Sequence, residues 1–255
     1  MSSQKVAILT GASSGIGYAV AELLAQDGYS LVIGSRNPAE AAERLSQISH
    51  APVIPIAGNF SDAATTRLLI EAAKDLGGLD AVMLNHGGPP VQSFMETTEE
   101  QWQASFDLMV QAPLRLLREA VPEFEKKGAG RVVAITSFTV KTPFAGIVLS
   151  NSLRAALLNA LKTAAIELGT KGILINAVAP GYIATDRLIE WNKGQAEQRG
   201  VTAADIASQS TAQIPLRRHG LPKEVAELVF FLLSERNGYV NGQQIHADGG
   251  LVTAI

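Results

Sequence analysis

Residues 6–25, "VAILTGASSGIGYAVAELLA", form the stretch that decides the fold. They pass from an apolar, β-branched run through a glycine-bearing loop into an Ala- and Leu-rich amphipathic run, a pattern typical of strand, loop and helix. Gly11, Gly15 and Gly17 let the loop turn sharply, let backbone amides approach an anion, and let the helix pack closely on the strand. A glycine triplet can be only a tight turn, but its place between a strand and a helix predicts a nucleotide-binding loop. The residues expected to form this binding loop are Gly11, Ser13, Ser14, Gly15, Ile16 and Gly17.

The rest of the chain alternates short apolar runs with longer helical patterns, which is typical of a parallel sheet covered by helices on both faces. Nearly every run is uninterrupted hydrophobic, as in strands that are buried on both faces. We expect strands at 5–10, 30–35, 52–57, 79–84, 131–136, 173–178 and 243–248, and helices such as 15–27, 61–76, 99–126 and 150–169. Because no repeat, linker or low-complexity tract marks a boundary, residues 1–255 are expected to form one α/β domain.

Residues 185–220, here called the lid segment, interrupt this alternation because no strand is expected within them. A long insertion near the end of such a fold is usually a functional lid or a disordered segment. We expect the lid segment to cover a substrate.

The composition excludes several classes of function. The chain has 255 residues, 47% of them hydrophobic, and a net charge of −3 with no basic run, so nothing indicates binding to nucleic acid or to an anionic membrane. The absence of cysteine excludes disulfides and thiolate metal sites, and it fits a cytoplasmic location. No signal peptide or membrane-spanning run is evident. His50, His219 and His246 lack metal-ligand spacing, so no metal site is expected.

Five segments in order resemble the short-chain dehydrogenase/reductase family, so the resemblance covers essentially the whole chain. The glycine loop "TGASSGIG" has the family's T-G-x-x-x-G-x-G spacing, and the other four segments are "NHGG" at 85–88, "GRVVAITS" at 130–137, "ILINAVAPGYIATD" at 173–186 and "NGQQIHADGG" at 241–250. The resemblance implies a Rossmann-type, doubly wound sheet of seven parallel strands, a nicotinamide dinucleotide and usually a homotetramer. The chain resembles the β-ketoacyl-carrier-protein-reductase-like branch of the family, in which imperfect catalytic tetrads occur.

The resemblance also implies which further residues meet the cofactor, in the crevice at the carboxyl ends of the strands. The stretch "GNFSD" resembles the family's adenine-binding segment, with Asn59 where an aspartate is usual. An amide can still bond an exocyclic amine through its oxygen. The residues implied are Asn59, Phe60, Asn85, Gly87, Arg154, Pro180, Gly181, Ile183 and Thr185.

The end of the second expected strand indicates which dinucleotide binds. An acidic residue there would bond the ribose 2′-hydroxyl of NAD and repel the 2′-phosphate of NADP. Ser35 stands at that position, and Arg36 follows it with a planar donor group suited to phosphate. Arg36 has an alternative interpretation as a surface residue at a strand end. NADP(H) is therefore favoured over NAD(H).

The expected catalytic residues depart from the family pattern. Members of the family usually employ a tyrosine as general acid or base, a lysine four residues later, a serine that orients the carbonyl, and an asparagine one helix earlier. Ser137 matches the serine, but Ser150 replaces the tyrosine, Arg154 the lysine and Met109 the asparagine. In isolation Ser150 or Asn151 would be interpreted as a helix cap, and Arg154 as a solvated charge. With the resemblance, we expect Ser137, Ser150 and Arg154 to form an altered active site.

Serine and arginine do not reproduce the proton relay, because serine has no useful acidity near pH 7 and arginine is effectively always protonated. His86 and Tyr182 are candidates to supply the proton; Lys141 is a weaker one. For each of them a plain structural or solvated role is the alternative. Two functions follow: an atypical NADP(H)-dependent oxidoreductase acting on a small carbonyl or alcohol, or a dinucleotide-binding protein that has lost catalysis and serves as a sensor or partner.

Self-association is expected at the end of the chain. The run "PKEVAELVFFLLSE" at 222–235 has more apolar residues than one buried helix face needs, and the chain ends in "GGLVTAI". With the resemblance, these features favour a homotetramer.

We predict that the chain binds NADPH at least several-fold more tightly than NADH, because Ser35 and Arg36 replace the acid that would repel a 2′-phosphate. The substitution Arg36→Asp should narrow or reverse this difference. Calorimetric titration of both cofactors into the unaltered protein and the variant measures it. Equal affinity, or a preference for NADH, in the unaltered protein contradicts the prediction.

Overall fold

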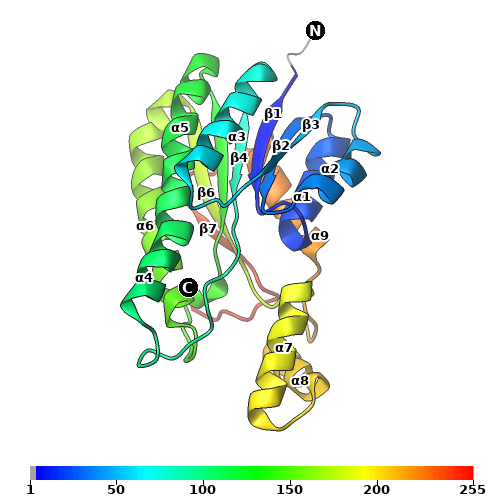
Figure 1. The fold of residues 1–255 in the computed structure, drawn as a ribbon, viewed down its shortest axis with the longest axis vertical. Coiled ribbons are helices and arrows are strands. Elements are labelled where there is room, and N and C mark those ends of the chain that lie inside the picture. Colours follow the sequence, from blue (N-terminus) through cyan, green and yellow to red (C-terminus); the bar gives the residue numbers. More distant parts are fainter. Residues whose placement is uncertain (1–3, 255) are drawn as a thin grey trace.

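The computed structural model describes residues 4–254, which form one parallel sheet of seven strands with helices on both faces (Figure 1). The strand order is β3-β2-β1-β4-β5-β6-β7. The strands are β1 (Val6–Thr10), β2 (Ser30–Ser35), β3 (Val53–Ala57), β4 (Ala81–Leu84), β5 (Gly130–Ile135), β6 (Ile173–Pro180) and β7 (Gln244–Ala247). This confirms the predicted doubly wound architecture, with each strand within two residues of its expected bounds.

The order of the strands creates the crevice that holds the site. The chain moves outward from β1 through β2 to β3, then returns to pair β4 with the other side of β1. At such a reversal, neighbouring loops at the carboxyl ends of the strands diverge to opposite faces of the sheet and leave a crevice between them. The glycine loop after β1 and the loop after β4 border this crevice.

Two hydrophobic cores, one on each face, hold the sheet between its helices. One core joins the sheet to α1, α2 and α9, and the other joins it to α3, α5 and α6. The inner strands β1 and β4 are buried along their whole length, as predicted, whereas the outermost strands β3 and β7 are partly accessible. The helices that cover the sheet are α1 (Gly15–Gln26), α2 (Ala39–Ser46), α3 (Ala63–Asp75), α5 (Ala112–Lys127), α6 (Val148–Leu168) and α9 (Pro222–Leu233).

The predicted helix at 99–126 has the right extent but is not one regular helix. It consists of α4 (Glu99–Phe106), a π-helical segment (Asp107–Gln111) and α5. A capping box between Thr98 and Gln101 starts it, and Gly128, at a φ of +69°, ends it. A π-helical turn is rare and is often found at functional sites. Here it buries Met109 against α6.

Helix α6 begins at Val148, two residues before the expected start at 150. Ser150 and Asn151 therefore lie inside its first turn, and the alternative interpretation of either as the helix cap is wrong. The Asn151 side chain instead donates from Nδ2 to the Phe144 carbonyl, at 2.9 Å.

The lid segment is ordered and helical, and it projects beyond the carboxyl ends of the strands (Figure 1). It contains α7 (Asp186–Arg199) and α8 (Ala203–Gln213), which pack against each other. Thr185 and Thr202 cap the two helices through their hydroxyl oxygens. Within residues 4–254, no helix is both long and apolar enough to cross a membrane.

Candidate active site

A cavity of about 860 Å³ lies at the carboxyl ends of the strands, between the glycine loop, the loop after β4 and the start of α7. The three predicted catalytic residues line it. The predicted cofactor residues also line it, except Gly17. A Cβ on Gly17 would lie 2.2 Å from the Gly11 carbonyl oxygen, so this glycine is needed for the contact between α1 and β1. The predicted cofactor residues that line the cavity are Gly11, Ser13, Ser14, Gly15, Ile16, Ser35, Arg36, Asn59, Phe60, Asn85, Gly87, Arg154, Pro180, Gly181, Ile183 and Thr185.

The glycine loop presents unused polar groups to this cavity. Gly11 and Gly15 adopt positive φ angles of +59° and +57°, which L side chains rarely adopt. Ser14 precedes α1, but its hydroxyl caps no backbone amide of that helix. The hydroxyl and the first amides of α1 are therefore available to an anion at the helix N-terminus.

Asn85 links the loop after β4 to the glycine loop through hydrogen bonds. Its side chain donates from Nδ2 to the Gly11 carbonyl at 3.0 Å, and its backbone amide donates to Thr10 Oγ1 at 2.9 Å. Thr10 Oγ1 donates in return to the Asn85 carbonyl at 2.7 Å. This exchange fixes the separation of the two loops across the cavity, so Asn85 shapes the site.

The end of β2 leaves a buried hydroxyl and a nearby cation without partners. Ser35 Oγ is buried and has no hydrogen-bond partner among residues 4–254. Arg36 is exposed and makes no hydrogen bond or ion pair to any residue that the structure describes. Asn59 Oδ1 accepts from the Ser61 amide at 3.2 Å and retains a second lone pair. These groups fit a ribose phosphate and a purine ring.

Arg154 is held by the carboxyl end of β5. Its Nη1 donates to the carbonyls of Ile135 and Thr136, at 3.0 and 2.9 Å, and its Nε donates to Ser150 Oγ at 3.2 Å. The two donors on Nη2 have no partner within the described chain. Burial, with a contribution from the Arg187 charge, lowers the pKa of Arg154 to about 10, so the group stays cationic at neutral pH.

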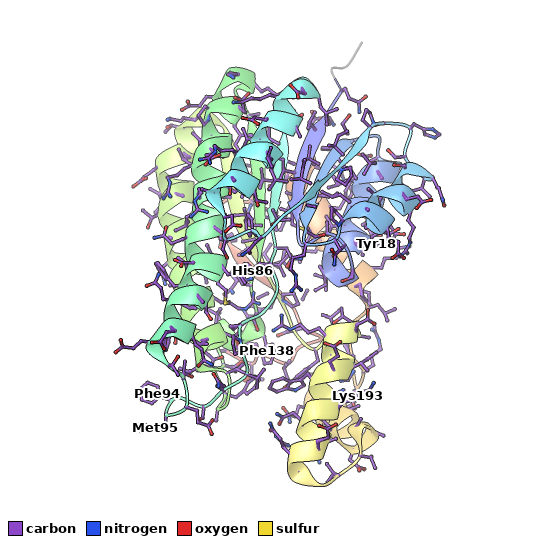
Figure 2. All side chains as sticks on the ribbon, in the orientation of Figure 1. Tyr18, His86, Phe94, Met95, Phe138 and Lys193 are labelled. Atoms are coloured by element: carbon purple, nitrogen blue, oxygen red, sulfur yellow. The ribbon has the colours of Figure 1, made fainter. Side chains whose placement is uncertain are left out.

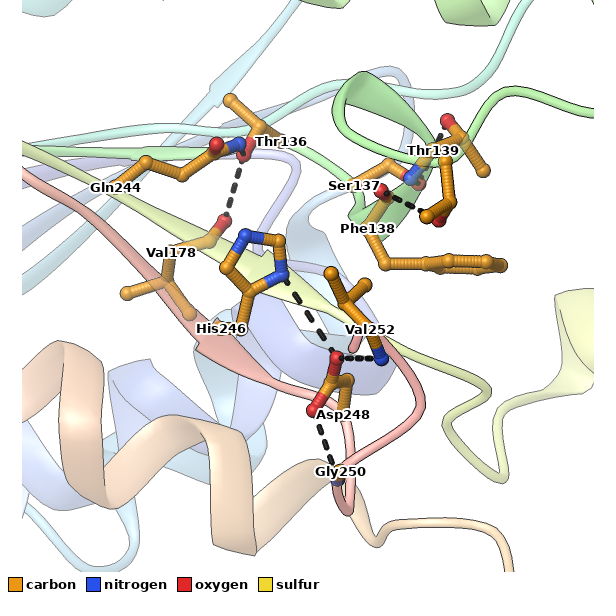
Figure 3. A network of polar contacts seen from close by, with 11 residues as sticks. Thr136, Ser137, Phe138, Thr139, Val178, Gln244, His246, Asp248, Gly250 and Val252 are labelled. Atoms are coloured by element: carbon orange, nitrogen blue, oxygen red, sulfur yellow. Dashed lines mark hydrogen bonds and ion pairs between the residues drawn. The ribbon is translucent and has the colours of Figure 1, made fainter. Parts of the chain in front are cut away.

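Ser137 follows β5, and its side chain contacts Thr139 (Figure 3). Its Oγ lies 3.2 Å from the Thr139 amide and 3.1 Å from Thr139 Oγ1, and it accepts from both. The Ser137 hydroxyl can therefore donate to an acceptor in the cavity. Met109 lies outside the cavity lining, fully buried in an apolar cluster with Leu149 and Leu153, so that position carries no polar group.

The surroundings of His86 and Tyr182 make both weaker proton donors near pH 7 than the free side chains. His86 Nδ1 lies 2.6 Å from the Gly87 carbonyl, so Nδ1 carries the proton and the buried Nε2 is an unpartnered acceptor. Burial, together with the Arg154 charge, lowers the pKa of His86 to about 3. Burial raises the pKa of the Tyr182 phenol, which makes it a weaker acid. Lys141 is exposed and does not line the cavity.

Several residues that the sequence analysis did not select also line the cavity. Arg187, in the first turn of α7, reaches the loop after β4, where its guanidinium fills the space that a Cβ on Gly88 would occupy. Phe138, Phe144 and Trp191 add an aromatic side. The spacing of Arg187 and Trp191, four residues apart in a helical pattern, is a signal that could have placed them on one face of a helix. Among residues 4–254, no group of three His, Cys, Asp or Glu is placed to hold a metal ion.

Comparisons with known proteins agree with this geometry. A family model described as enoyl-(acyl carrier protein) reductase matches residues 11–252. The chain is 34% identical over 254 residues to dehydrogenase/reductase SDR family member 4 of Homo sapiens, covering 96% of this chain and 87% of the relative. It is 33% identical over 258 residues to the NADPH-dependent reductase BacG of Bacillus subtilis, covering 99% and 100%.

Among solved structures, L-sorbose reductase from Gluconobacter frateurii, in complex with NADPH and L-sorbose, has a TM-score of 0.93 to this chain at 30% identity. The match covers 99% of this chain and 98% of that one. The fold, the ordered motifs and these matches confirm the resemblance seen in the sequence: the chain belongs to the short-chain dehydrogenase/reductase family.

Proposed function

We propose that the chain is an NADP(H)-dependent oxidoreductase that transfers hydride between the nicotinamide and a carbonyl or alcohol substrate, such as a 3-oxoacyl thioester or another ketone. The observation that carries this proposal is the single cavity in which the glycine loop, Arg36, Arg154 and Ser137 all have polar groups without partners. BacG and the L-sorbose reductase are NADPH-dependent or NADPH-bound reductases by name, which supports the same cofactor here.

The residues of the cavity fit the proposed cofactor. Ser14 and the amides at the start of α1 hold the pyrophosphate, and Ser35 with Arg36 holds the 2′-phosphate through charge-assisted bonds. Arg154 directs its two free Nη2 donors to the nicotinamide ribose, while its other donors keep it fixed to β5. When bound, NADPH supplies the hydride. The lid segment covers the substrate, because α7 lines one side of the cavity.

The chain's own residues polarise the substrate but provide no ordinary acid. Ser137 donates to the substrate oxygen, and the cationic Arg154 adds positive charge near it. Neither Ser150 nor Arg154 exchanges a proton readily, so the proton reaches the product from solvent. General acid or base catalysis typically contributes about 10²- to 10⁴-fold, and turnover is therefore lower than in members with the full tetrad by up to that factor.

A second function has one observation in its favour. Met109 and Ser150 replace the asparagine and the tyrosine that would complete the proton path in the family pattern. Met109 is also buried in an apolar cluster. A dinucleotide-binding protein that acts as a sensor or partner would not need this path. The retained Ser137 and the open cavity beside it favour the oxidoreductase.

We predict NADPH oxidation by a subset of ketones or ketoacyl thioesters, at rates below those of family members with a complete tetrad, because hydride transfer by proximity survives without the acid. A spectrophotometric screen over both substrate groups measures it, with calorimetric binding of NADPH in parallel. Tight NADPH binding with no oxidation by any substrate favours the sensor function. The absence of NADPH binding contradicts both functions.

We predict that Arg154→Ala weakens NADP(H) binding by roughly 1.5 to 3 kcal/mol, the range for losing hydrogen bonds to a charged group. Ser150→Ala should leave the affinity nearly unchanged, because Ser150 only accepts a bond from Arg154. Calorimetry measures both, and thermal melts control for loss of folding, since Arg154 also bonds two backbone carbonyls. If Ser150→Ala abolishes turnover while binding persists, Ser150 takes a direct part in the chemistry and its assignment here is wrong.

We also propose that the chain is a cytoplasmic homotetramer. The cysteine-free composition supports the reducing compartment. Leu228, Phe230 and Phe231 of α9 are only partly buried, every residue of the edge strand β7 stays partly accessible, and Tyr239 between them is 99% exposed. A second copy packed on this face would cover these groups.

Light scattering at micromolar concentration should give four times the mass of one chain. The substitution Phe231→Asp should dissociate the assembly, because it would bury a charge in the interface. The exposed Lys223→Asp on the same helix controls for the charge alone. A monomeric unaltered protein refutes this assembly.

A further inference from the structure

A second cavity, of about 410 Å³, adjoins the first beneath α7 and α8. Four aromatic side chains line both cavities. The Phe138 ring lies 6.1 Å from that of Phe144 and 5.3 Å from that of Tyr182, and the Phe144 ring lies 6.4 Å from that of Trp191. Phe138 lies between the strand ends and α7 in Figure 2. The four rings therefore form an aromatic wall, Phe138, Phe144, Tyr182 and Trp191, shared by the two cavities.

A buried amide opens onto the second cavity without a partner. Asn192 of α7 is 8% exposed, and its side chain makes no hydrogen bond to any residue in 4–254. It lines the second cavity. Its amide atoms are not among the fully buried side-chain atoms that lack a partner, so they remain accessible from the cavity. Asn192 can therefore both donate to and accept from a ligand that enters this cavity.

The other polar groups around this cavity are also suited to a neutral ligand. Gln209 and Gln213 add exposed amides without partners in the described chain, whereas Gln195 and Ser210 already bond other residues. Arg199, the cation that lines the cavity, is exposed and already donates to Gln195 Oε1 at 2.9 Å. No carboxylate of the described residues lines it. Amides and hydroxyls match ligand hydroxyls, which both donate and accept.

The aromatic wall adds an apolar face to this polar set. A compound that carries several hydroxyls on a carbon skeleton presents C–H groups to ring faces and hydroxyls to amides. A long alkyl chain would find few aliphatic partners, since Ile206 and Leu251 are the aliphatic residues of the lining. The composition of the cavity thus distinguishes a polyhydroxylated compound from an acyl chain.

We propose that the second cavity is the distal part of the substrate site and binds the hydroxylated portion of a polyhydroxylated ketone or alcohol. The proposal rests on the proposed oxidoreductase function and names its substrate class. Asn192 is a specificity-determining residue in this account, and the aromatic wall packs against the carbon skeleton.

The first experiment compares NADPH oxidation by butanone, erythrulose, fructose and an acetoacetyl thioester. We expect kcat/KM to rise at least tenfold from butanone to fructose, because each added hydroxyl gains bonds in the second cavity. A preference for the thioester, or equal rates with butanone and fructose, overturns the proposal.

The second experiment uses variants. Asn192→Leu removes the amide at nearly constant volume and should lower kcat/KM for fructose about tenfold, mainly through KM, with butanone changed less than twofold. If Asn192→Leu fails to fold, Gln209→Leu, at an exposed position of the same cavity, provides the test. This variant should lower kcat/KM for fructose about fivefold. Gln26→Leu, the same type of change on the exposed end of α1, is the matched control and should change neither substrate. Equal losses for fructose and butanone overturn the proposal.

A binding measurement separates this proposal from the redox function. Of the two tryptophans, Trp191 belongs to the aromatic wall and Trp102 packs in the cluster around Met109. Fructose or sorbitol should therefore quench the fluorescence of Trp191 in the NADPH complex, and Asn192→Leu or Gln209→Leu should weaken this quenching. Quenching without NADPH oxidation supports the site while contradicting the redox function. If no hydroxylated compound quenches the fluorescence or causes NADPH oxidation, the proposal is overturned.

Discussion

The structure depends on one close approach of two backbone segments, between Gly17 in the first helix and Gly11 at the end of the first strand. A Cβ on Gly17 would stand 2.2 Å from the Gly11 carbonyl oxygen, far inside contact distance. Only a glycine lets α1 start directly over the end of β1. This approach aims the unbonded amides of the helix start at the crevice, where the order of the sheet reverses between β1 and β4. The cofactor cavity therefore follows from the packing of the first strand and helix.

In the proposed site, Arg154 keeps one part of the role of the lysine that the family pattern has at this position. A lysine offers one nitrogen, whereas the guanidinium has a planar set of five donors. Here three donors join Arg154 to β5 and to Ser150, and two remain for a ligand. The cation is thus fixed to the end of a central strand, which favours binding and polarisation. Because arginine keeps its proton, the proposed site has no proton relay through this residue, and the buried Met109 provides no polar group for one.

The lid segment provides the features that differ most from a general cofactor site. Helix α7 contributes Arg187 to the cofactor cavity, Trp191 to the aromatic wall, and Asn192 to the second cavity. Three residues of one short helix thus meet three different parts of the proposed ligands. The proposed substrate contacts of the second cavity therefore lie largely on this helix, whereas the glycine loop and Arg36 lie in the first half of the chain.

The sequence by itself determined the strands and the glycine loop, because they depend on local periodicity and on a short motif, and its resemblance to the family indicated many of the residues that line the first cavity. Only the tertiary structure decided the π-helical turn that buries Met109, the reach of Arg187 to Gly88, and the unpartnered amide of Asn192. These features depend on contacts between segments far apart in the chain. The low pKa of His86 arises in the same way, from burial and from the charge of Arg154 on α6. A linear pattern records which residues are apolar or charged, and packing decides which of them meet.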